Sequence, residues 1–154
     1  MNAHQQSCPY DLTVNHEGYV SIWAGIVPLN AIPNDYFEER YCEDGNTHLT
    51  KFYGDFDFHS HDHDKVDSNC YTKCSRSFER LIGECSFSES YVAAATERAR
   101  AIGVETTQQV MLLYDFRYDL NPSMILKSLN MQFIGSFPYD AASASAFEHN
   151  WDED

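Results

Sequence analysis

The sequence predicts a single α+β domain in which a mostly antiparallel sheet packs against two or three helices. Three observations favour this class. The chain has 154 residues, the size of one domain, and its 43% hydrophobic and 14% aromatic residues are enough to build one core. Strand-like alternation lies near both ends of the chain, with helical spacing between. The last two strand patterns are joined by a modest loop, which is typical of an antiparallel pair.

The first regular element is predicted as a strand over residues 19–24. Its aromatic and β-branched side chains alternate, so Val20, Ile22 and Ala24 share one face and Trp23 points to the other. We expect Trp23 to be buried in the core.

The next stretch gives weaker patterns. Pro33 suits a first helical turn and acidic residues follow it, which predicts a short helix over residues 33–41. Residues 49–58 mix aromatic side chains with Asp55 and Asp57, and this pattern is compatible with a strand or a loop.

Two helices are predicted in the middle of the chain. Residues 75–83 have apolar side chains at helical spacing and end at Gly83. Ser86 and Glu89 then form a capping-box pattern that opens the strongest amphipathic helix, which Gly103 closes.

Two strands are predicted to close the domain, over residues 110–118 and 131–137, with a connection over residues 120–130. The even-numbered residues of the first of these strands are expected to line one buried face. The other face is apolar at its start and polar at its end, where Asp115 and Asp119 lie.

These elements divide the chain into three parts. Residues 1–17 are polar and unpatterned and are predicted to form a flexible arm, and residues 18–140 form the α+β domain. Residues 141–154 form an acidic tail that we expect to be mobile, with Phe147 and Trp151 available to dock on the domain.

The net charge of −14, from 24 acidic and 10 basic residues, limits the class of partner. Binding to nucleic acid or to an anionic membrane requires a basic face, so both are predicted to be absent. A basic protein partner fits, because an acidic surface accelerates its association. Plain solubility is the alternative explanation of the charge.

Several features predict a cytoplasmic protein with reduced thiols. The N-terminus has no apolar segment typical of a signal peptide, and no apolar run approaches the ~18 residues of a membrane span. Five cysteines at irregular spacing do not form a disulfide framework. Of these, Cys85 lies on a predicted apolar helix stripe, so core packing is favoured there over catalysis.

Acidic residues concentrate between residues 35 and 64, where nine of them stand against two basic residues and alternate with aromatic residues. Aromatic anchors with a charged rim are typical of tight protein interfaces. A solvated acidic face over an aromatic core is the alternative, and core packing is favoured for Phe37, Phe52 and Phe56. The candidate partner-binding residues are Glu43, Asp44, Asp55, Asp57, Tyr53, Asp115 and Asp119.

A histidine-rich run offers a different function. His59, His61 and His63 alternate, and in an extended chain they would face the same way, with Cys70 and Cys74 close enough to add ligands for zinc. The spacing fits no standard zinc site, so a solvated polar loop is the favoured interpretation. A small metal-binding protein or metal-dependent enzyme remains the alternative. No HExxH, GxSxG or P-loop motif occurs, and we assign no catalytic residue and no cofactor.

Five segments carry a resemblance: Gly18-Tyr-Val-Ser-Ile-Trp-Ala-Gly25, Tyr41-Cys-Glu-Asp-Gly45, Cys85-Ser-Phe-Ser-Glu-Ser-Tyr91, Leu112-Leu-Tyr-Asp-Phe-Arg-Tyr118 and Phe133-Ile-Gly-Ser-Phe-Pro-Tyr139. In order and spacing they resemble the immunity protein 22 family of bacterial polymorphic toxin systems. The chain departs from that pattern at residues 28–34, which are less acidic, and at the histidines and cysteines of residues 59–74.

The resemblance implies a non-enzymatic bacterial protein, made beside a secreted toxin, that binds the toxin domain and keeps the producing cell alive. Many such toxins are nucleases with basic substrate clefts. The charge of this chain adds a physical argument of its own, because a surface rich in carboxylates can mimic a phosphate backbone in such a cleft.

Overall fold

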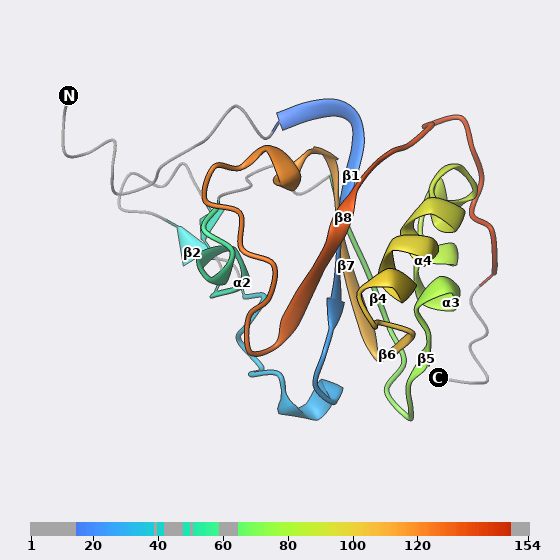
Figure 1. Cartoon of the computed structure of the whole chain (residues 1–154). Coiled ribbons are helices and arrows are strands. Elements are labelled where there is room, and N and C mark those ends of the chain that lie inside the picture. The colour runs from blue at the N-terminus through green and yellow to red at the C-terminus, as the bar shows by residue number, and fades with distance from the viewer. Residues whose placement is uncertain (1–14, 39, 42–47, 50, 59–64, 149–154) are drawn as a thin grey trace, which may run out of the picture.

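A four-stranded antiparallel sheet forms the centre of the computed structural model, which describes residues 15–38, 40–41, 48–49, 51–58 and 65–148 (Figure 1). The strand order is β4-β7-β1-β8, so the first long strand lies between the last two, and the prediction that those two strands pair with each other is wrong. The sheet and its helices confirm the predicted α+β class. The strands are β1 (Asn15–Gly25), β4 (Val66–Cys70), β7 (Gln109–Phe116) and β8 (Met131–Pro138).

Helices cover both faces of this sheet. Helices α3 (Phe78–Gly83) and α4 (Val92–Ala101) lie on one face, and the short helix α2 (Lys51–Asp55) lies on the other (Figure 1). The remaining elements are the 3-10 turns η2 (Leu29–Ala31), η4 (Ser88–Ser90) and η5 (Tyr118–Leu120), and the short strands β2 (Arg40–Tyr41), β3 (His48–Leu49), β5 (Arg76–Ser77) and β6 (Thr106–Thr107).

Strand β1 separates two hydrophobic cores. Val20, Ile22 and Ala24 pack in the core under α3 and α4, and Trp23 packs in the core under α2, as the alternation predicts. Trp23 is fully buried among five aromatic rings. Their centroids lie 5.1 to 5.9 Å from that of Trp23, and they belong to Phe52, Phe56, Phe58, Tyr118 and Phe133.

Strand β7 does not keep one face buried along its length, so that prediction is wrong at the strand's end. Leu112 and Tyr114 pack toward α3 and α4, but Phe116 packs with Leu113 in the other core. The cause is Asp115, whose backbone is left-handed with φ 58. A left-handed residue interrupts the two-residue alternation, and the next side chain then points to the opposite face.

The predicted helix of residues 75–83 is confirmed as α3, and Ser77 caps it by accepting a hydrogen bond from the Arg80 backbone N–H at 3.0 Å. The predicted capping box is wrong. Phe87 adopts a left-handed backbone with φ 63, and α4 starts only at Val92 without a side-chain cap. Gly103, with φ 84, closes α4 as expected.

The acidic middle of the chain also differs from the prediction. Residues 34–37 form turns instead of the helix expected over residues 33–41. Residues 51–55 form helix α2, which is neither strand nor loop. Phe52 and Phe56, one helical turn apart, are both buried and hold this short segment against Trp23.

Residues 141–148, here called the C-terminal strap, lie across α3 and η4. The Phe147 N–H donates to the Gly83 carbonyl at 2.9 Å, and the Ala146 N–H donates to the Ser88 hydroxyl at 2.8 Å. The Ser145 hydroxyl donates to the Cys85 carbonyl at 2.8 Å. Phe147 therefore docks on the domain, whereas Trp151 lies outside the described residues.

Among the helices that the structure describes, none is long and apolar enough to cross a membrane.

Candidate functional site

Several predicted site residues cannot be placed. Glu43 and Asp44 lie outside the described residues, and so do His59, His61 and His63. In the part of the chain that is described, no three His, Cys, Asp or Glu side chains are grouped as metal ligands. The surface around the other predicted residues is therefore the candidate site.

The two cysteines of the alternative metal site are more exposed than Cys85. Cys70 is half-buried on β4, and Cys74 is exposed beside Arg76, whose guanidinium contacts its sulfur. Cys85 is buried, and burial, together with the nearby charge of Asp67, raises the pKa of its thiol well above the ordinary value. Cys85 is thus a core residue with an inert thiol, as predicted.

Asp55 and Asp57 lie at the C-terminal end of α2, and both are exposed. Asp57 has a left-handed backbone with φ 55. Its N–H donates to the Gly54 carbonyl at 3.2 Å, and the Phe58 N–H donates to the Tyr53 carbonyl at 3.1 Å. This is a Schellman motif, which ends the helix sharply and fixes the backbone that carries both carboxylates.

Tyr53 lies beneath the end of α2, and its role as a partner-contacting residue stays a prediction. Its side chain is only 9% exposed. Its ring centroid lies 4.9 Å from that of Phe58, the apolar contact that accompanies a Schellman motif. Tyr53 therefore positions the end of α2 from below.

The connection between β7 and β8 is tied to the end of α2. The Tyr118 hydroxyl donates to the Phe56 carbonyl and accepts from the Ile125 N–H at 2.7 Å. Burial raises the pKa of Tyr118 to about 12, so this hydroxyl keeps its proton at any physiological pH. The Asn121 side-chain amide donates to the Asp57 carbonyl at 3.0 Å. Figure 1 shows the connection running beside α2.

An open hollow of about 590 Å³ lies where α2 meets this connection. Tyr36, Asp55 and Leu129 are among its lining residues. The Tyr36 hydroxyl donates to the Asp55 carboxylate at 2.6 Å and lies 3.3 Å from the Ser128 hydroxyl. Lys51, also at the hollow, pairs with Asp35 at 2.7 Å. The hollow thus joins an aromatic ring, an exposed apolar side chain and a fixed carboxylate.

The same connection exposes an apolar surface that sequence reasoning missed. Leu129 is 88% exposed, the largest value among the exposed large hydrophobic side chains of the described residues. The available signal was the density of large apolar residues within residues 120–130, without a helix or strand period. Four side chains make up this surface, here called the apolar ridge: Leu120, Met124, Leu126 and Leu129.

Asp115 and Asp119 differ in their surroundings. The Asp115 carboxylate accepts from the Gly18 N–H at 2.9 Å and from the Tyr139 hydroxyl at 2.7 Å, and it pairs with Lys65 at 2.9 Å. Partial burial alone would raise its pKa, but these three donors outweigh that effect and hold the pKa below its ordinary value.

Asp115 therefore ties three segments of the fold together, and its role as a contact residue stays a prediction. Asp119 is exposed, pairs with Arg117 at 2.8 Å and directly precedes Leu120 of the apolar ridge.

The net charge is distributed unequally along the sequence. Residues 71–105, which include α3, η4 and α4, contain five acidic and five basic residues. The net charge of −14 therefore comes from the rest of the chain, and residues 35–64, which include α2, contribute the largest share. The candidate site lies in this acidic part.

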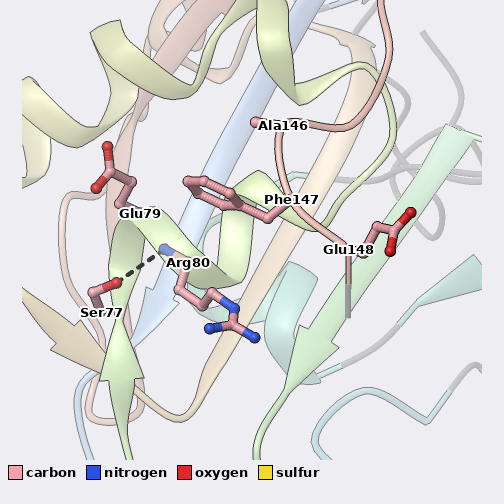
Figure 2. A pocket seen from close by; sticks show the side chains of 6 residues that line it. All are labelled: Ser77, Glu79, Arg80, Ala146, Phe147 and Glu148. Carbon is pink, nitrogen blue, oxygen red and sulfur yellow. Dashed lines mark hydrogen bonds between the residues drawn. The ribbon is translucent and has the colours of Figure 1, made fainter. Parts of the chain in front are cut away.

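A second hollow, of about 580 Å³, lies beside α3 and the C-terminal strap (Figure 2). Figure 2 shows the ring of Phe147 over α3, with Glu79 and Arg80 near it. Arg80 is already paired with the buried carboxylate of Glu84 at 2.6 Å. This hollow is the seam between the strap and α3, and its one basic residue, Arg80, is held by the fold.

An α+β domain with an apolar ridge beside exposed carboxylates is typical of small proteins that act through surface contact with another macromolecule. The chain belongs to the immunity protein 22 family, whose sequence model matches residues 20–140. This match confirms the resemblance found over residues 18–140. No curated protein and no solved structure matches the chain.

Proposed function

We propose that this chain is a non-enzymatic immunity protein that binds and neutralises a cognate bacterial toxin domain through an acidic surface. Membership of the immunity protein 22 family supports toxin neutralisation as the general role. The nine acidic residues between residues 35 and 64, the part of the sequence that includes α2, support an acidic contact surface on the α2 side. The protein acts in the cytoplasm and uses no cofactor.

The observation that carries the proposal is the placement of Asp55 and Asp57. Both carboxylates are exposed on a helix end whose backbone is fixed by the Schellman motif and by Asn121. Charges held in place on a rigid element need little reordering when a partner binds. They also attract a basic partner over about one Debye length, ~10 Å at 0.1 M salt.

Nucleases are a class of toxin that this surface suits. A nuclease cleft is basic because it binds phosphates, and carboxylates on a rigid surface can occupy the same positions. Neutralisation would then follow from exclusion of the nucleic acid, without any chemical step.

The test starts from the gene immediately upstream, which we expect to encode a large secreted toxin. The toxin domain is expressed in bacterial cells together with this chain, and survival is measured. The wild-type chain should protect the cells. A variant that combines Glu43→Lys, Asp44→Lys, Asp55→Lys and Asp57→Lys should protect them much less, because the charge reversal repels a basic partner.

The matched control reverses four acidic residues of the α3–α4 layer, Glu79→Lys, Glu89→Lys, Glu97→Lys and Glu105→Lys, and should protect normally. Full protection by the first variant, with its fold verified by circular dichroism, would refute the acidic surface on the α2 side. Failure of the wild-type chain to protect would refute toxin neutralisation itself.

A further inference from the structure

We infer that the apolar ridge is the central contact of the toxin interface and that it seats in an apolar depression of the toxin bordered by lysine and arginine side chains. This inference rests on the proposed function and names the contact surface and the chemistry of the partner.

The ridge is exposed and yet rigid. The Ser128 hydroxyl accepts from the Asn130 and Met131 N–H groups at 3.2 and 3.0 Å, which fixes the turn that carries Leu129. The Leu126 carbonyl accepts from the Phe133 N–H of β8 at 2.7 Å, so the backbone at Leu126 is bound to the sheet. An apolar side chain on a fixed backbone loses little entropy when a partner covers it.

The number of exposed apolar residues in this one connection is also unusual. Exposed large apolar side chains are normally scattered singly over a surface. Here four of the six found in the described residues lie in one connection, and Leu126 and Leu129 are 50% and 88% exposed. Exposed apolar side chains gathered in one segment are typical of contact sites, whose buried centres provide most of the binding energy.

The charges around the ridge identify the occupant. Asp55 and Asp57 lie beside the ridge, because Tyr36 bonds to the Asp55 carboxylate and Asn121 bonds to the Asp57 carbonyl. Neither carboxylate has an ion-pair partner among the described residues. Two basic residues near this surface are already neutralised: Lys51 of α2 and Arg117, which follows β7, are each paired with an aspartate.

Lys127 is the one basic residue within residues 120–130, and that segment contains no acidic residue. The border of the ridge thus has an excess of unpaired negative charge, which is complementary to a basic surface.

The hollow between α2 and the connection can bind one basic side chain of this partner. A lysine or arginine side chain that enters it can lay its apolar stem against Leu129 and Tyr36 and place its charged head at Asp55. The Tyr36 hydroxyl already holds that carboxylate at 2.6 Å, so its orientation is set before binding. The volume of about 590 Å³ leaves ample room for one such side chain.

The test measures binding kinetics between the purified chain and the toxin domain encoded upstream. Leu129→Ser and Leu126→Ser should each raise the dissociation rate constant by about tenfold or more, because the loss of a central apolar anchor acts after docking. Asp55→Asn combined with Asp57→Asn should mainly lower the association rate constant and weaken its dependence on salt. Both leucines are exposed, so these variants retain the fold.

The controls use matched residues elsewhere. Val66→Ser changes an exposed apolar residue at the other edge of the sheet, and Glu97→Gln with Glu105→Gln changes exposed acids in the charge-balanced layer. Both should leave the two rate constants unchanged.

Three results would overturn the inference. The first is tight binding by wild type with unchanged kinetics for the leucine variants, which would leave the proposed function standing and place the contact elsewhere. The second is a dimer of the chain alone that Leu129→Ser dissolves in sedimentation experiments, which would assign the ridge to a second copy. The third is the absence of any binding by wild type, which would refute the proposed function and this inference together.

Discussion

Asp57 shows how one residue can serve both the fold and the surface. Its φ of 55 places it at the left-handed position that ends α2, where glycine is the commonest residue. Aspartate tolerates this conformation better than most side chains, at some cost relative to glycine. In return the position carries a charge that glycine cannot provide, on a backbone that Asn121 holds in place.

Asp115 has a left-handed backbone as well, but its carboxylate faces inward. We predict that Asp115→Asn lowers the free energy of unfolding by about 1–3 kcal/mol near pH 7, because the Gly18 N–H, the Tyr139 hydroxyl and Lys65 lose a charged acceptor. Asparagine tolerates the left-handed backbone, so strain is not added.

The pH dependence of this loss has a definite sign. The folded protein holds the pKa of Asp115 below its ordinary value, so the carboxylate stabilises the fold above about pH 3.9, the pKa of an unfolded aspartate. That stabilisation disappears as the pH falls through the lower folded value. Urea unfolding of wild type and variant should therefore converge below about pH 4, and a gap that stays constant from pH 7 to strong acid would contradict this role.

Sequence patterns predicted the identity of the candidate site residues better than their orientation. The acidity of Asp55, Asp57, Asp115 and Asp119 is visible in the sequence, but their orientation is not. Asp115 reads as a surface residue from alternation alone, and its partner Tyr139 directly follows β8, a strand distant in sequence. A left-handed residue inside a strand leaves no signal in hydropathy, so the inward turn of Asp115 could not be predicted.

At the scale of elements, the long strands and helix α3 could be predicted, whereas helix α2 and the start of α4 could not. Strands β1 and β8 have enough alternating residues to define a face. Helix α2 has only five residues and contains Gly54, so its helical form depends on the packing of Phe52 against Trp23 instead of on intrinsic propensity. The left-handed Phe87 likewise overrides a good capping-box sequence.

The C-terminal strap depends on a glycine in α3. A Cβ at position 83 would stand 2.2 Å from a ring carbon of Phe147. We predict that Gly83→Ala displaces the strap, so amide hydrogens of Ala146 and Phe147, now bonded to Ser88 and Gly83, exchange faster with solvent. Alanine normally stabilises a helix relative to glycine by about 0.5–1 kcal/mol, and here that gain should be lost.

Adding Phe147→Ala to Gly83→Ala separates the two effects. The double variant removes the clash, so the alanine should then stabilise α3 relative to Phe147→Ala alone. Hydrogen exchange by mass spectrometry and urea unfolding measure the two quantities. Unchanged exchange in Gly83→Ala would show that Phe147 does not depend on the space above Gly83.

For the whole molecule, the dominant feature is a large negative charge that is distributed unequally along the chain. Repulsion among unpaired carboxylates opposes the compact state, and salt screens it. We predict that the melting temperature rises as NaCl increases from about 10 mM to about 150 mM, while the association rate with a basic toxin falls over the same range. Calorimetry and stopped-flow fluorescence measure the two trends, and parallel changes in both would contradict the assignment of the charge to the interface.

The sheet has a consequence for how the protein can change over generations. Side chains of β1 alternate between two cores, and only one of these supports the ridge and the acidic helix end. Substitutions in residues 120–130 or at the end of α2 therefore leave the packing of α3 and α4 unaffected, and distant sites contribute to stability almost additively. A lineage can thus change the residues exposed on one side of the molecule while the other side keeps the fold stable.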